Sequence, residues 1–119
     1  MLLITSATAV LQLVTNTAAA IDVHATWVDT SGVAITPGRQ NFSVAGAVTS
    51  TIVPSPPANT QRNIKTVHIR NKDVSLNCNI IVQIFDGSAT FPVYNNVLNF
   101  GDMVELTDFA GFHVITKSY

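Results

Sequence analysis

The feature that most constrains this chain is an alternation of apolar and polar residues with a period of two. Its clearest example is the segment 21–28. One face of this segment is apolar and carries Ile21, Val23, Ala25 and Trp27. Successive side chains of a β-strand point to opposite faces, so the segment predicts a strand with one buried face. No stretch keeps a helical period over three turns, and the chain therefore favours an all-β fold.

Similar segments recur along the chain, separated by Gly, Pro, Asn and Asp residues that favour turns. We expect strands at residues 21–28, 47–53, 64–70, 78–85, 89–94, 97–100, 103–106 and 112–116. Segment 78–85 is apolar on both faces, which predicts a central strand. Pro92 cannot donate a ladder hydrogen bond, so it predicts an edge or a bulge in its strand.

The segments between the expected strands predict how the strands are paired and connected. We expect residues 2–5 and 10–14 to pair with each other, and the last two strands to pair across residues 108–111. Ser31-Gly32 and Pro37-Gly38 predict turns, and residues 38–46 the longest loop. The prolines at 54–57 favour an extended crossing. The whole chain, 1–119, is then one antiparallel β-sandwich of eight or nine short strands, with jelly-roll or immunoglobulin-like connectivity.

The low content of charged residues predicts a property of the protein surface. Charged residues make up only 11 % of the chain, against about 25 % in ordinary globular proteins. Thr, Ser and Asn take their place. We expect part of the surface to be covered by other copies of the chain, as a dimer or trimer, or by a larger assembly. The alternative is that neutral polar side chains solvate the surface well enough by themselves.

Charge and cysteine content exclude several classes of protein. The net charge of −1 argues against a nucleic-acid binder, which normally has a basic excess. Cys78 is the only cysteine, so the chain has no internal disulfide and no cysteine-rich zinc site. No apolar run approaches the roughly 18 residues that cross a bilayer, and no Lys or Arg precedes Arg39 as in a secretory leader. We expect no membrane partner and a soluble protein made in a cytoplasm.

Candidate catalytic and metal-binding residues form no known pattern. His24, His68 and His113 lie on separate expected strands without His-x-His spacing, so we interpret them as solvated surface residues rather than metal ligands. Asp102, Glu105 and Asp108 lack the ligand spacing of a calcium loop and predict a solvated turn. Nucleophile, phosphate-binding and dinucleotide-binding motifs are absent. We therefore expect no enzyme, no metal and no cofactor.

The basic residues are concentrated in one segment. Four of the six lie between positions 62 and 72, namely Arg62, Lys65, Arg70 and Lys72. The acidic residues at 102, 105 and 108 lie near the C-terminus. A basic patch on one copy could therefore meet an acidic patch on a neighbour. The alternative is that the two regions neutralise each other within one subunit.

Several short motifs carry a resemblance to a known class of proteins. They include Thr36-Pro37-Gly38-Arg39, Val53-Pro54-Ser55-Pro56 and Thr60-Gln61-Arg62, followed by a strand that ends at Asn71 and a final strand pair near Gly101-Asp102 and Gly111-Phe112. This arrangement resembles small β-sandwich virion proteins of tailed bacteriophages. The resemblance implies a role as a capsid cement or decoration protein, or as a tail accessory protein. It implies no functional residues.

We therefore expect a non-enzymatic virion structural protein, assembled in the host cytoplasm, that self-associates and binds the major capsid protein or another virion protein. A head–tail, tail, baseplate or fibre-anchoring component is the alternative. A carbohydrate-binding module is a second alternative, with Trp27, Tyr94 and Tyr119 as stacking residues. We expect residues 1–14 to form an assembly arm or edge strands, and 54–61 a second contact element. The predicted contact residues are Leu2, Leu3, Val10, Leu11, Leu13, Pro54, Pro56, Pro57, Arg62 and Arg70.

Overall fold

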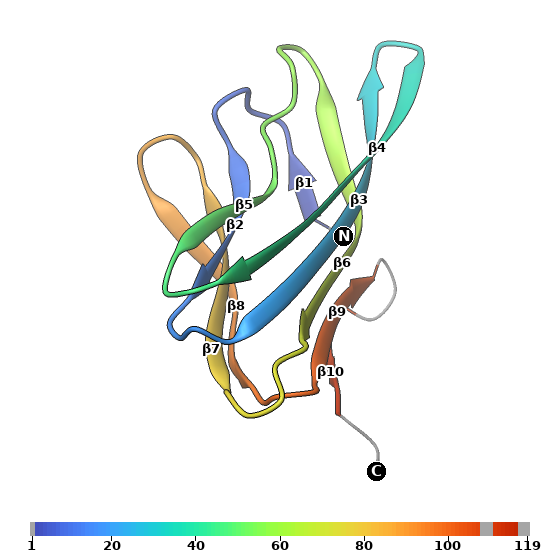
Figure 1. The fold of residues 1–119 in the computed structure, drawn as a ribbon. Helices are drawn as coiled ribbons and strands as arrows, with labels where there is room; N and C mark the ends of the chain where they lie inside the picture. The colour runs from blue at the N-terminus through green and yellow to red at the C-terminus, as the bar shows by residue number, and fades with distance from the viewer. Residues whose placement is uncertain (1, 108–110, 117–119) are drawn as a thin grey trace.

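A computed structural model describes residues 2–107 and 111–116 of the chain. Ten β-strands and no helix lie in these residues (Figure 1). The strands are β1 (Leu2–Ile4), β2 (Val10–Thr15), β3 (Ala20–Ser31), β4 (Ala34–Ala45), β5 (Thr49–Val53), β6 (Gln61–Asn71), β7 (Cys78–Phe85), β8 (Thr90–Leu98), β9 (Met103–Thr107) and β10 (Gly111–Ile115). With no helix in the described part of the chain, none there is long and apolar enough to span a membrane.

Two antiparallel sheets pack together as a β-sandwich, as the alternating pattern predicted. Sheet A has six strands in the order β10-β9-β6-β3-β4, and β1 pairs with the same edge of β6 as β9. Sheet B has four strands in the order β5-β2-β7-β8. The hairpins β3–β4, β7–β8 and β9–β10 each stay within one sheet, and the other connections cross between the sheets.

The core forms where the buried faces of the two sheets meet. Ile21, Val23, Ala25 and Trp27 of β3 are buried, which confirms the face predicted from the sequence. Leu11 and Leu13 of β2 face them from sheet B, with 0 % of each side chain exposed. One face of each sheet is thus removed from water, which is the main stabilising contribution to such a fold.

Four expected features of the strands are confirmed. β7 has the predicted bounds and lies inside sheet B, between β2 and β8. β8 is an edge strand, and its pairing with β7 shifts register beside Pro92, so Pro92 marks both an edge and a bulge. The last two strands pair antiparallel. Residues 54–60 cross from sheet B to sheet A without strand structure.

Other expectations are wrong. Residues 38–46 form no loop, because 38–45 belong to β4, which pairs with β3 from Ala34 to Ala45 without a shift. Pro37-Gly38 makes no turn there, since an edge strand tolerates a proline whose missing N–H would face solvent. Residues 2–5 and 10–14 do not pair with each other, because β1 joins β6 in sheet A and β2 joins sheet B. The strands number ten among the described residues, with 95–96 continuing β8 instead of breaking it.

Gly38 lies inside β4 for a steric reason. It is opposite Trp27 in the β3–β4 register, and a Cβ atom at Gly38 would lie 2.2 Å from Trp27 Nε1. The indole of Trp27 therefore occupies the space in which any other residue would place its side chain. A glycine that looked like a turn residue in the sequence is the packing partner of the core tryptophan.

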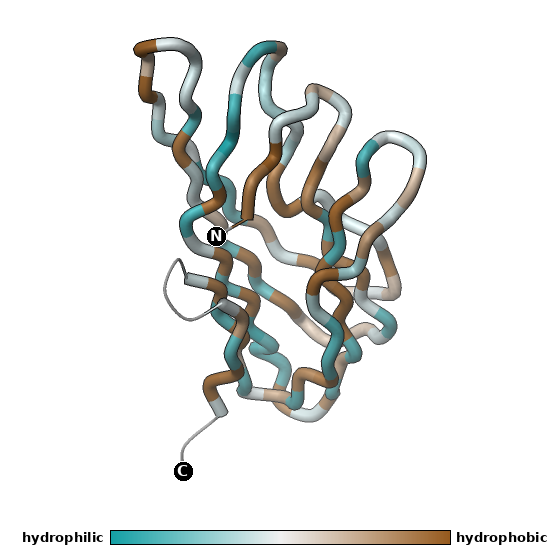
Figure 2. Tube along the Cα trace, turned by 180° about the vertical axis from the view of Figure 1, so that it is seen from behind, coloured by the Kyte–Doolittle hydropathy of each residue, from teal (hydrophilic) through white to brown (hydrophobic). Residues whose placement is uncertain are grey.

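The tip of the β3–β4 hairpin projects beyond the body of the sandwich (Figure 1). Ser31 pairs with Ala34 across the two residues Gly32 and Val33, and Gly32 has a positive φ of 59°. This is the geometry of a two-residue hairpin loop with glycine in first position. The hydrophobic colouring at this tip in Figure 2 agrees with the exposure of Val33 (103 %) and Ile35 (72 %).

Candidate functional site

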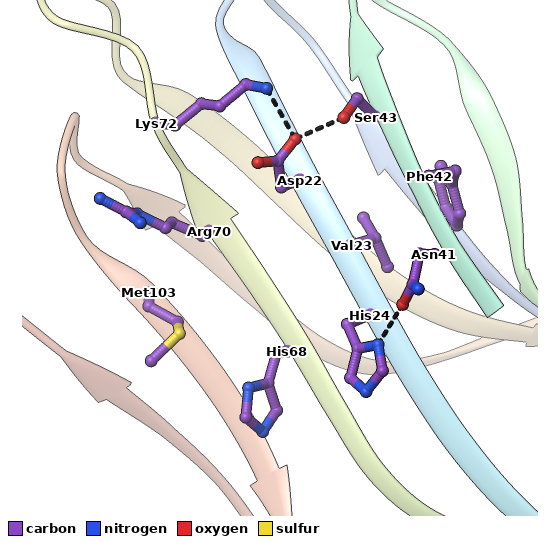
Figure 3. A pocket seen from close by; sticks show the side chains of 10 residues that line it. All are labelled: Asp22, Val23, His24, Asn41, Phe42, Ser43, His68, Arg70, Lys72 and Met103. Carbon is purple, nitrogen blue, oxygen red and sulfur yellow. Dashed lines mark hydrogen bonds and ion pairs between the residues drawn. The ribbon is translucent and has the colours of Figure 1, made fainter. Parts of the chain in front are cut away.

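The outer face of sheet A carries a shallow, open depression across β4, β3, β6 and β9 (Figure 3). Its side chains come from neighbouring positions in the strand registers. One row contains Ser43, Asp22, Arg70 and Met103, and the next contains Asn41, His24, His68 and Glu105. Lys72 lies just beyond the end of β6 and reaches the first row. Strand alternation thus gathers polar residues that are distant in sequence onto one surface.

Asp22 is the best-connected group in the depression. Its Oδ1 accepts a hydrogen bond from Ser43 Oγ and lies 2.9 Å from Lys72 Nζ (Figure 3). These two contacts, the Ser43 hydrogen bond first, hold the pKa of Asp22 below its usual value. Because the pKa falls when the charged form is favoured, Asp22 is a carboxylate fixed by its neighbours.

The histidines lie in one cross-strand row. His24 is opposite His68, and their ring centroids are 6.0 Å apart in an edge-to-face arrangement. His24 Nδ1 bonds Asn41 Oδ1, and His68 Nε2 lies 3.8 Å from Glu105 Oε1. His113 is opposite Glu105 in the β9–β10 register. Among the described residues, no three His, Cys, Asp or Glu side chains converge closely enough to hold a metal ion.

Four of the basic residues face outward on sheet A. Arg39 is opposite Thr26 and Arg70 is opposite Asp22, both on the outer face. Lys72 approaches Asp22 on that face, and Lys65 joins Arg39 around a second shallow depression beside Val28 and Pro37. This surface therefore combines cations, two carboxylates and three histidines. It suits hydrogen bonding and charge contacts with water or polar ligands.

The outer face of sheet B has the opposite chemistry. Of the described residues at its outward positions, none is ionisable. These positions hold Val10, Gln12, Val14, Thr49, Thr51, Asn79, Ile81, Gln83, Phe85, Thr90, Pro92, Asn95 and Val97. We call this surface the uncharged face. Cross-strand registers pair apolar residues on it, Val10 with Phe85 and Val14 with Ile81, and Gln83 Nε2 donates to Gln12 Oε1 at 2.9 Å between these pairs.

The predicted contact residues are scattered over the molecule. Val10 lies on the uncharged face, Arg70 on the outer face of sheet A, and Leu2 and Leu3 on β1. Pro54 and Pro57 are at least partly exposed in the crossing segment, whereas Pro56 is buried. The structure therefore does not bring the ten residues together as one surface.

Besides the buried Pro56, three more of these residues require a correction. Leu11 and Leu13 are core residues of β2, which hydrogen-bonds to strands on both sides and so forms neither an arm nor an edge. Arg62 is 7 % exposed. In the folded subunit, burial removes all three side chains from any surface that a partner could touch.

Arg62 instead forms a largely buried ion pair with Asp29, which the sequence did not lead us to expect. Its Nε and Nη2 donate to the two carboxylate oxygens of Asp29, at 2.8 and 2.9 Å, and its Nη1 donates to Pro54 O at 2.7 Å. The guanidinium carbon also lies 4.8 Å from the centroid of the Trp27 ring. Charge argued for a surface position, and strict alternation from Val67 and Ile69 also put position 62 on the outer face. The bulge between residues 64 and 66 of β6 reverses that parity and turns Arg62 inward.

Two of the four clustered basic residues pair within the subunit with acidic residues of β3. Arg62 and Lys72 pair with Asp29 and Asp22 of β3 rather than with the C-terminal acidic residues. Of that acidic cluster, Asp102 is buried, Glu105 lies near His68, and position 108 is outside the described residues.

The two expected glycan-stacking aromatics among the described residues lie apart from each other. Trp27 is 8 % exposed in the core. Tyr94 stacks on Phe112 with ring centroids 4.9 Å apart, which connects the edges of the two sheets. Position 119 lies outside the described residues. Cys78 is buried, as expected, beside Asn16.

Comparisons with protein-family models, with curated protein sequences and with solved structures each gave no significant match to this chain.

Proposed function

We propose that the chain is a non-enzymatic structural protein of a virion, specifically a capsid decoration protein that lies on the major capsid protein and stabilises contacts between its subunits. The observation that carries this proposal is the uncharged face of sheet B. The short motifs that resemble phage virion proteins supply the kind of particle. In this role the chain would assemble in the host cytoplasm and remain in the virion.

The uncharged face suits contact with a large protein surface for an energetic reason. Moving a charge out of water costs several kcal/mol unless it is well paired, whereas apolar and neutral side chains lose little. The cores of protein interfaces are accordingly depleted of charged residues. Val10, Phe85, Val14 and Ile81 supply apolar area, and the Gln12–Gln83 hydrogen bond is already formed within the subunit.

The test is the location of the protein in purified virions, detected with a gold-labelled antibody raised against the folded chain. We expect label distributed over the whole head. Label confined to one vertex or to the tail would overturn the decoration role in favour of a connector or tail component. Absence of the protein from particles would overturn the virion assignment, and binding on a glycan array would then support a carbohydrate-binding module.

A further inference from the structure

β4 has the longest open sheet edge among the described strands. β4 is twelve residues long, ends sheet A, and pairs with β3 without a register shift. The other sheet edges are short or interrupted: β5 and β10 have five residues each, and β8 carries Pro92 and a bulge. Short edges, prolines and bulges prevent edge-to-edge pairing, and β4 beyond Pro37 has none of these features.

The hairpin geometry shows which backbone groups of β4 face this edge. A two-residue loop closes on a hydrogen-bonded pair, here Ser31 and Ala34, so even-numbered residues of β4 bond to β3. Odd-numbered residues then present their N–H and C=O groups at the open edge. Pro37, which lacks an N–H, is among them, as expected for a proline on an edge. No backbone hydrogen bond to this edge occurs in the described part of the chain.

We propose that a second copy of the chain binds this edge, so that β4 pairs antiparallel with β4 of the other copy about a two-fold axis at Asn41. This inference rests on the self-association that the proposed function includes, and it specifies the surface. The two A sheets become one continuous sheet. An axis perpendicular to that sheet places both uncharged faces on the same side, where both can lie on one particle surface.

Charge complementarity supports this register. Pairing centred on Asn41 places Arg39 of one copy opposite Ser43 of the other. Ser43 is hydrogen-bonded to Asp22 on the adjacent strand, within reach of an arginine side chain on the same face. Arg39 is the only charged residue of β4, and it is away from the axis, so the two copies bring no like charges together.

The exposed hairpin tip supports the same register independently. Centring on Asn41 directs the tip of one copy past Ala45 of the other, toward the turn in which the chain leaves sheet A and Val48 O accepts a hydrogen bond from Thr15 N of β2. The tip is apolar, with Val33 and Ile35 exposed, and Val48 is 45 % exposed. Each projecting tip therefore reaches an apolar residue of the second copy, and the pairing buries side chains that the single subunit leaves in water.

The first experiment uses sedimentation equilibrium and disulfide trapping. We expect a reversible dimer, and an Asn41→Cys variant that cross-links under mild oxidation. Residues on the axis of a hydrogen-bonded pair have Cα atoms about 5.5 Å apart, within the range of a disulfide. Asn95→Cys, on the open edge of β8, is the matched control. After the same oxidation, we expect this variant to remain monomeric when it is denatured without reductant. Cross-linking at 95 but not at 41 would overturn the proposal.

Two further variants separate dimerisation from folding. Asn41→Pro removes an N–H that only the dimer uses, so we expect a monomer that keeps the buried-type fluorescence of Trp27. Arg39→Glu places a like charge near Asp22 of the second copy, and we expect the dissociation constant of the dimer to rise about tenfold.

A wild-type monomer that still decorates virions would overturn this inference alone. A dimer that never binds virions would overturn the proposed function alone.

Discussion

The outer faces of the two sheets differ in chemistry although the same strand alternation builds them. Sheet A presents Arg39, Lys65, Arg70 and Lys72 with Asp22, Glu105 and three histidines, whereas the described outward positions of sheet B present no ionisable group. The chain is therefore poor in charge because one whole face has none, rather than because charge is diluted evenly. The composition led us to expect a covered surface, and the uncharged face is the surface that we propose for this contact.

Some charged groups on the outer face of sheet A are paired with other side chains of the same face. Asp22 has Ser43 and Lys72 as partners, and His68 lies near Glu105. Such exposed contacts contribute little stability, roughly 0–1 kcal/mol each, but they keep the face compatible with water. The uncharged face has only the Gln12–Gln83 contact across its centre. We infer that sheet A faces solvent and sheet B faces the particle.

The largest expected effect concerns Arg62, a cation of sheet A that belongs to neither face because it points between the sheets. Arg62→Ala leaves the Asp29 carboxylate partly buried without its partner. We expect the free energy of unfolding to fall by about 3–5 kcal/mol, measured by urea unfolding followed through Trp27 fluorescence. Arg70→Ala, on the exposed face, should change it by less than about 0.5 kcal/mol. Equal losses of unfolding free energy in the two variants would contradict the difference between the inward Arg62 and the outward Arg70.

The second prediction tests the two faces directly. Gln83→Lys puts a charge at the centre of the uncharged face, and Thr66→Lys puts one on the face of sheet A. We expect Gln83→Lys to weaken binding to virions that lack the protein by about 100-fold, because the charge must be buried unpaired. Thr66→Lys should bind like the wild type in the same co-sedimentation assay. The reverse result would assign the particle contact to sheet A.

A third prediction concerns the interior that both faces share. Gly38→Ala forces the Trp27 ring to move, because the new Cβ would lie 2.2 Å from Nε1. We expect a loss of about 1–3 kcal/mol in the free energy of unfolding, with a red shift of Trp27 emission. Thr51→Ala on the uncharged face is the control. An unchanged emission maximum in Gly38→Ala would contradict the close packing of Trp27 against Gly38.

The smallest effect concerns pH. Folding lowers the pKa of Asp22 through Ser43 and Lys72, and that of Asp86 through the backbone N–H groups of Ala89 and Ser88. Groups with lowered pKa values stabilise the fold above their unfolded pKa, near 3.8, and lose that contribution as the pH falls through the folded value.

We therefore expect the urea midpoint to be constant near neutral pH and to fall below about pH 4. Asp22→Asn should flatten part of this fall, whereas Gln83→Asn, on the face without ionisable groups, should leave the profile unchanged. An identical pH profile in Asp22→Asn and the wild type would contradict the role of the Asp22 contacts.

Much of the fold was predictable, because burial on one side imposes a period of two on each strand. The central β7 and the buried face of β3 followed from that pattern. β4 was missed, because Pro37 and Gly38 favour a turn locally. Its inward positions also include Gly38 and Gln40, which give no apolar stripe. Tertiary packing against Trp27 overrode the local preference.

The candidate surfaces were less predictable than the strands. A contact surface depends on which strands are neighbours, and strand order cannot be derived from alternation. Arg62 and Arg70 are close in sequence and equally basic, yet one is buried and the other is exposed. The bulge between them, at Lys65 and Thr66, shifts the parity of β6. Only the register reveals that shift.

We propose that the uncharged face contacts the particle while the face of sheet A remains in solvent. Hydroxyl-radical footprinting of the protein, free and bound to virions, tests it most directly. We expect protection of Val10, Phe85 and Val97 on binding, with His24, His68 and Met103 as reactive as in the free protein. Protection of the histidines and Met103, with Phe85 and Val97 unchanged, would contradict the account.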